Sequence, residues 1–132
     1  MAALSLDALR DEMRVETDLL IVQDLDGVCM PLVKDPLTRS LRADYVKAAA
    51  GMQNQFSVLT NGEHEGRRGV NRLVEQALGD NEKARREGLY LPGLAAGGVQ
   101  FQDRFGVVSH PGVSDEEMSF LESVPQRMGD LL

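Results

Sequence analysis

The chain has 132 residues, enough for one domain with a modest core, and 42% of them are hydrophobic. Fourteen Lys and Arg stand against 21 Asp and Glu, which gives a formal net charge of −7 at pH 7. That balance argues against a nucleic-acid-binding protein, which needs clustered cations to neutralise phosphates. No apolar run approaches the roughly 20 residues of a membrane-spanning helix, and a single cysteine suits a reducing compartment.

A helix, a strand and a polar turn are expected first along the chain. Residues 4–14 set apolar side chains at helical spacing among charges, which predicts a short amphipathic helix. The apolar run at 19–22 leads to Asp24 and is typical of a parallel strand buried on both faces. Gly27 then breaks the strand.

A second strand and two helices are expected next. Residues 40–53 predict a helix, 56–59 a buried strand, and 64–78 another helix that ends at Gly79. The side chains expected to face inward from the first of these helices are those of Leu41, Tyr45, Ala48 and Ala49. The order strand, helix, strand, helix indicates an α/β fold with an open parallel sheet.

The second half of the chain has a different pattern. Residues 80–87 are highly charged and predict a solvated surface stretch. Short strands are expected at 89–91 and 99–101, with the glycine-rich residues 93–98 as a turn leading into a cap strand. Ser114 and Glu117 have capping-box spacing, so a helix is expected over 115–128, with Met118, Leu121 and Val124 inward.

The chemically richest segment is Asp24-Leu25-Asp26-Gly27. In open α/β sheets, ligands bind beyond the carboxyl ends of the strands, where the first apolar run places Asp24. One carboxylate could attack phosphorus while the other transfers a proton. Mg²⁺ is bound by one or two carboxylates together with water and phosphate oxygens. Gly27 allows a turn in which backbone N–H groups face a phosphate. The alternative is an ordinary polar turn after a strand.

The second expected strand ends at Thr60-Asn61-Gly62. If the two strands are neighbours, Thr60 lies within reach of the same phosphate as Asp24. A helix beginning near Glu63 would add its N-terminal N–H groups. The alternative for Thr60 and Asn61 is that they cap that helix. His64, beside its start, could contact a sugar or simply be exposed.

These two segments together resemble the first two signature motifs of the haloacid-dehalogenase superfamily: an apolar strand followed by D-x-D-G, and an apolar strand followed by Thr or Ser. Residues 19–39, 56–80 and 87–113 look more specifically like the cyanobacterial glucosylglycerol-phosphate phosphatases. The resemblance extends from about Leu19 to about Pro125. It implies a partial haloacid-dehalogenase-like, Rossmann-like sheet with flanking helices and the start of a cap.

The resemblance also implies roles for individual residues. Asp24 would be the nucleophile and a Mg²⁺ ligand, and Asp26 the general acid/base, also on Mg²⁺ through its backbone carbonyl. Thr60 would bind the transferring phosphoryl group with support from Asn61. The implied substrate is glucosylglycerol 3-phosphate, hydrolysed in the cytoplasm to a compatible solute during salt acclimation.

Two further motifs of the superfamily, a Lys or Arg for the phosphoryl oxygens and a later acidic cluster, have no clear match here. Residues 1–132 are therefore interpreted as one domain that forms the N-terminal portion of a longer phosphatase, with weak or absent activity by itself. An incomplete sheet would leave an unpaired edge, which favours self-association. The alternatives are another sugar phosphatase (for sucrose or trehalose phosphate), a non-catalytic binding module, and a phospho-acceptor signalling domain.

Overall fold

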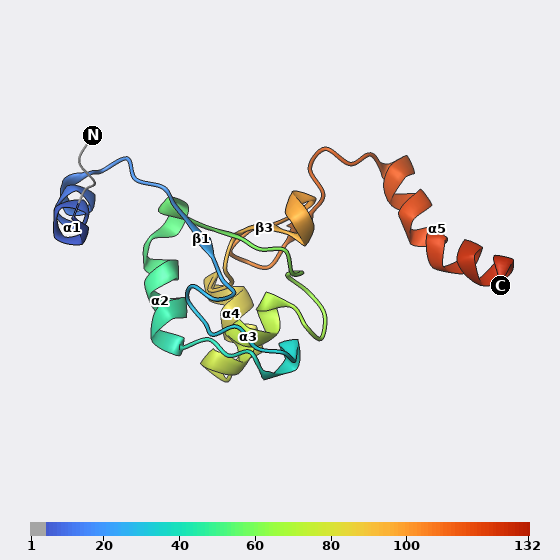
Figure 1. Cartoon of the computed structure of the whole chain (residues 1–132), viewed down its shortest axis with the longest axis horizontal. Coiled ribbons are helices and arrows are strands. Elements are labelled where there is room, and N and C mark those ends of the chain that lie inside the picture. The colour runs from blue at the N-terminus through green and yellow to red at the C-terminus, as the bar shows by residue number, and fades with distance from the viewer. Residues whose placement is uncertain (1–4) are drawn as a thin grey trace.

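The computed structural model describes residues 5–132, which fold around one five-stranded sheet (Figure 1). Residue 4 of the first expected helix lies outside this range. The helices are α1 (Leu6–Val15), α2 (Ala43–Gly51), α3 (Val70–Leu78), α4 (Asn81–Glu87) and α5 (Asp115–Leu131), and three short 3-10 turns span Pro36–Thr38, Gln53–Gln55 and Ala96–Gly98. The strands are β1 (Ile21–Asp24), β2 (Phe56–Leu59), β3 (Gly93–Ala95), β4 (Gln100–Gln102) and β5 (Val108–Ser109).

The strands follow one another across the sheet in the order β1-β2-β3-β4-β5. β1 pairs with β2, and β2 with β3, in parallel, whereas β4 and β5 are added antiparallel. The predicted α/β class with a parallel, partial Rossmann-like sheet is therefore confirmed for the first three strands. The antiparallel extension begins at β4, after the glycine-rich residues 93–98.

One face of the sheet holds the core. Phe56 and Val58 of β2 are buried against side chains of α2 and α3, and Figure 1 shows α2, α3 and α4 gathered on one side of the strands. On the other face Val22 and Leu59 remain 57% and 48% exposed. The expectation that the first strand is buried on both faces is wrong, because β1 is an edge strand with one open face.

The first half of the chain departs from prediction mainly in where its helices begin. α2 starts at Ala43, and Val46 and Ala49 are buried while Ala48, expected inward, is exposed. Tyr45 packs edge-on against Phe56, with ring centroids 6.3 Å apart. The second predicted helix begins six residues late, at Val70, but it ends as expected at Gly79.

The second half contains one helix and one strand that the sequence pattern did not indicate. The expected surface stretch 80–87 is α4, which Asp80 caps. The expected strand 89–91 is irregular, and β3 lies instead at 93–95, where a turn was expected. The predicted strand at 99–101 is confirmed, shifted by one residue, as β4.

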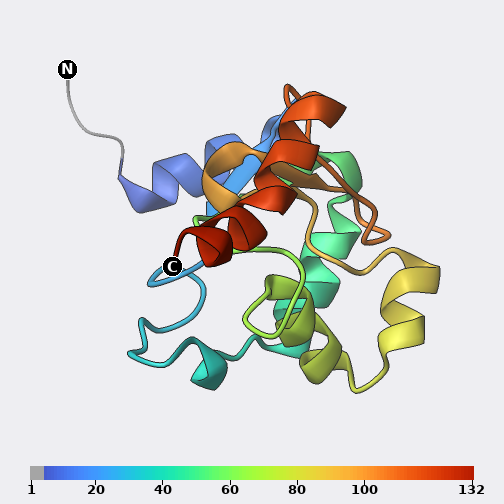
Figure 2. The same cartoon turned by 90° about the vertical axis from the view of Figure 1, so that its right-hand side faces the viewer.

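The expected C-terminal helix is also confirmed, including its capping box, but its inward face is not. α5 buries none of its residues, and Leu121 is 56% exposed. Figure 1 shows α1 and α5 at opposite ends of the long axis, and Figure 2 shows the same arrangement from the side of α5. No helix in the described range is long and apolar enough to cross a membrane.

Candidate functional site

The register of β1 and β2 places the two polar strand ends side by side. Asp24 is paired with Leu59, so Thr60 follows directly beyond the partner of Asp24. Neighbouring strands lie about 4.8 Å apart. The carboxylate loop and the threonine therefore leave the sheet at the same edge, as predicted from the sequence. The Asp24 side chain is exposed there.

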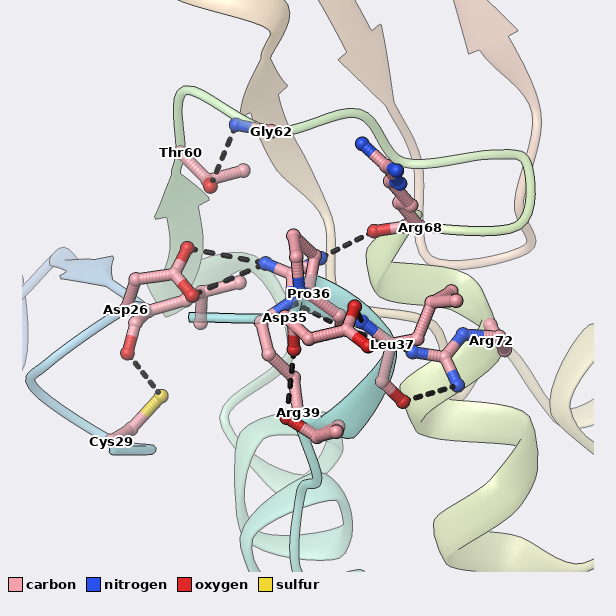
Figure 3. A network of polar contacts seen from close by, with 12 residues as sticks. Asp26, Cys29, Asp35, Pro36, Leu37, Arg39, Thr60, Gly62, Arg68 and Arg72 are labelled. Atoms are coloured by element: carbon pink, nitrogen blue, oxygen red, sulfur yellow. Dashed lines mark hydrogen bonds and ion pairs between the residues drawn. The ribbon is translucent and has the colours of Figure 1, made fainter. Parts of the chain in front are cut away.

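Asp26 lies in the loop after β1 and is held by an arginine (Figure 3). Its two carboxylate oxygens each accept a hydrogen bond from Nη1 of Arg39 at 3.2 Å. The Arg39 side chain is only 7% exposed, whereas that of Asp26 is 36% exposed. The carboxylate is thus fixed from its protein side and open on its solvent side.

Thr60 is buried beside this pair. Its hydroxyl oxygen accepts a hydrogen bond from the N–H of Gly62 at 3.2 Å, and its own N–H donates to Leu94 of β3. A Cβ atom added at Gly62 would lie 3.6 Å from the Thr60 hydroxyl oxygen and 3.9 Å from Nη1 of Arg39. The hydroxyl and the guanidinium that holds Asp26 therefore lie close to the same glycine.

Gly27 and Asn61 are the other predicted site residues. Gly27 has φ +78, so the expected tight turn is present, but its N–H donates to the carbonyl of Met30 rather than into the site. Asn61 is exposed, and its side chain makes no hydrogen bond to any residue of the described range. Its supporting role, like the catalytic roles of the two aspartates, stays a prediction.

The helix expected to begin near Glu63 is replaced by a loop. Its turn is closed by the carbonyls of Glu63 and His64, which accept from the N–H groups of Val70 and Asn71. Gly69 precedes α3, and a Cβ there would lie 2.3 Å from the Glu65 carbonyl. The predicted helix N-terminus beside the phosphate is therefore wrong.

His64 has neither of the positions expected for it. Its side chain is fully buried, and Nε2 lies 2.9 Å from the carbonyl oxygen of Gly93. Its backbone N–H donates to the side chain of Gln100. His64 thus ties the loop after β2 to β3 and β4, and it does not face a sugar.

Sequence reasoning missed Arg39. It follows a 3-10 turn that begins at Pro36, in a segment where proline predicts only irregular chain, and no spacing rule links it to Asp26. Its neighbours in sequence include Asp35, Thr38 and Ser40, so no local pattern indicates a buried arginine. The one available signal was its charge, because a buried arginine is almost always paired. A cation beside Asp26 is therefore already present among the described residues.

A divalent cation is the group that the chemistry of these residues implies. Within residues 5–132, no three His, Cys, Asp or Glu side chains gather into a metal cluster. Mg²⁺ does not need three, because it keeps several waters and takes one or two carboxylates plus phosphate oxygens. Asp24, exposed at the strand end, and the backbone carbonyl of Asp26 fit that requirement.

Cys29, three residues after Asp26, has no sign of activation. Its thiol donates to the carbonyl of Leu25, and burial, aided by the charges of Asp26 and Asp24, raises its pKa. A raised pKa keeps the thiol protonated and therefore a poor nucleophile. Asp24 therefore stays the predicted nucleophile of this loop.

Comparison with known proteins identifies the family of the chain. The family model described as glucosylglycerol-phosphate phosphatase matches residues 18–132. A glucosylglycerol-phosphate phosphatase from Synechocystis sp. is 62% identical over 115 residues, which make up 87% of this chain and 27% of that relative. The chain thus spans about a quarter of the length of this relative. Because the family model matches most of its residues, the chain belongs to the glucosylglycerol-phosphate phosphatase family.

Proposed function

We propose that this chain is the nucleophile-bearing part of a Mg²⁺-dependent phosphatase that hydrolyses glucosylglycerol 3-phosphate. The observation that carries the proposal is the register of β1 and β2, which brings Asp24, Asp26 and Thr60 to one edge of the sheet. The name of the Synechocystis relative supports the substrate. The cytoplasm and salt acclimation are the proposed setting.

In this mechanism, a carboxylate oxygen of Asp24 attacks phosphorus and forms an aspartyl-phosphate, while the ester oxygen leaves. Asp26 gives a proton to that leaving oxygen and later takes one from the water that hydrolyses the acyl phosphate. The hydroxyl of Thr60 donates a hydrogen bond to a phosphoryl oxygen. Bound Mg²⁺ would neutralise charge on the phosphoryl oxygens.

The experiment is a phosphate-release assay with glucosylglycerol 3-phosphate and Mg²⁺, comparing the chain with Asp24→Asn. Loss of the nucleophile is expected to lower kcat by orders of magnitude. Asp18→Asn is the matched control, because Asp18 is an exposed aspartate just before β1. Equal rates for the chain and Asp24→Asn would remove Asp24 from the mechanism.

The substrate is tested by offering sucrose phosphate and trehalose phosphate in the same assay, with the Synechocystis relative as the positive control. A preference for glucosylglycerol 3-phosphate is expected, and a preference for either disaccharide phosphate would favour another sugar phosphatase. If the relative is active and this chain releases nothing from any ester, the result supports the interpretation that the chain is an N-terminal portion that is inactive by itself.

A further inference from the structure

We propose that Arg39 is the positioning residue for Asp26, holding its carboxylate in the orientation from which it exchanges a proton with the ester oxygen and with water. The inference rests on the proposed function, and it adds a residue to it. Arg39 comes from the segment between β1 and α2, before the second strand of the sheet begins.

The guanidinium of Arg39 is anchored on three sides. Nη1 donates to both carboxylate oxygens of Asp26, Nε donates to the carbonyl of Pro36 at 3.3 Å, and Nη2 donates to the carbonyl of Arg68. These acceptors belong to the loop after β1, the 3-10 turn and the loop before α3 (Figure 3). A planar group bound at all three nitrogens cannot turn without breaking contacts, so its position is fixed by the fold.

Asp26 needs such an anchor because its loop does not fix the carboxylate. Apart from Arg39, no described residue donates a hydrogen bond to its side chain, which is 36% exposed. A general acid or base must approach the reacting oxygen within about 2.6–3.2 Å. A carboxylate free to rotate into solvent would be in that position for only part of the time.

The burial of Arg39 also indicates that its specific partner is Asp26. A guanidinium this buried is costly without a counter-charge, and Asp26 is the only carboxylate with which it forms an ion pair in residues 5–132. Thr60 lies on the same side, since the Cβ position of Gly62 is within 3.9 Å of both Nη1 and the threonine hydroxyl oxygen. The ion pair therefore lies on the side of the loop where Thr60 would contact the phosphate.

Arg72 provides a matched control. It donates to the carbonyls of Pro36 and Leu37, in the same 3-10 turn that Arg39 contacts, but not to Asp26. Arg72→Met therefore removes a guanidinium that contacts the same 3-10 turn but does not contact the carboxylate.

The test is a double-mutant cycle of Arg39→Met and Asp26→Asn on steady-state phosphate release. Arg39→Met is expected to lower kcat by roughly ten- to a hundredfold, a share of what acid–base catalysis supplies, with KM little changed. In the Asp26→Asn background it is expected to have no further effect, and Arg72→Met is expected to leave kcat unchanged. Equal effects of Arg39→Met in both backgrounds, or an effect confined to KM, would overturn the proposal in favour of direct phosphate binding.

Urea unfolding of every variant, including the conservative Arg39→Lys, shows whether a substitution disrupts the fold. The midpoint shift caused by Arg39→Met is expected to be smaller in the Asp26→Asn background, and additive shifts would overturn the pairing itself. The two hypotheses fail separately. Full activity of Asp24→Asn contradicts the proposed function. If the unaltered chain releases no phosphate, the unfolding cycle still decides whether Arg39 holds Asp26.

Discussion

His64 shows how far a single buried side chain can depart from its ordinary chemistry. Nε2 donates to the carbonyl of Gly93, which leaves Nδ1 as an acceptor without a partner among the described residues. Burial lowers the pKa of His64 below 6.5, against smaller opposing effects of the hydrogen bond to Gly93 and the charge of Glu65. The folded protein therefore favours the neutral imidazole.

The lowered pKa of His64 predicts a loss of stability in acid. Below pH 6.5 the unfolded chain binds a proton at this residue while the folded chain resists it, so stability is full above pH 6.5 and falls as the pH drops toward the folded-state pKa. Urea midpoints measured between pH 8 and pH 5 are expected to show this decline. In His64→Asn the decline is expected to be smaller, whereas His110→Asn should keep it. An unchanged slope in His64→Asn would contradict the assignment.

The residues that could be predicted from sequence are those whose neighbours along the chain define them. Asp24 and Asp26 follow an apolar run directly, and Thr60 ends the next one. Arg39 and His64 could not be placed, because their partners lie 13 and 29 residues away in sequence and no local pattern connects them. Their roles arise from loop contacts that exist only in the folded chain.

Between elements, a pair of side-chain amides joins α3 to β4. Asn71 donates to Gln102 at 2.6 Å, and Gln102 donates back to Asn71 at 2.9 Å and to the carbonyl of Leu91 at 3.3 Å. Gln102 is fully buried, on the helix-covered face of the sheet. The antiparallel extension is thereby tied to the helix that covers the parallel part.

Asn71→Ala is expected to destabilise the chain by about 1–3 kcal/mol, because it leaves the buried amide of Gln102 short of one donor and one acceptor. Asn81→Ala, an exposed asparagine at the start of α4, is the control and should change the free energy of unfolding by less than about 0.5 kcal/mol. Urea denaturation measures both. Equal urea midpoints for the two variants would mean that the amide pair does not contribute to the free energy of unfolding.

The boundaries of helices and strands differ from prediction where the backbone conformation or packing requires a glycine. β3 was expected as a turn because it opens with Gly93, yet a Cβ there would lie 2.1 Å from the carbonyl of Val58. Close packing of two strands therefore requires the residue that usually indicates a turn. The delayed start of α3 has a similar cause, since Gly66 adopts φ +84 and interrupts a pattern that is otherwise helical.

At the scale of the whole molecule, the sheet has one covered and one open face. Val22, Leu59 and Phe101 share the open face through the strand register, and they are 57%, 48% and 39% exposed. β1 also forms an edge of the sheet, with backbone groups that no described strand pairs. An apolar face beside a free edge is the arrangement that favours association between copies.

We therefore expect this chain to self-associate with rising concentration, through β1 and the open face. Sedimentation velocity should show a weight-average mass that grows with concentration. Val22→Lys with Leu59→Lys should return the chain to a monomer, because charge at Val22 opposes pairing of the edge strand and charge at Leu59 opposes burial of the open face. Val107→Lys is the control, since Val107 is 61% exposed but lies outside the strands. A monomer at every concentration would contradict this expectation, and equal suppression by Val107→Lys would attribute the association to net charge rather than to this face.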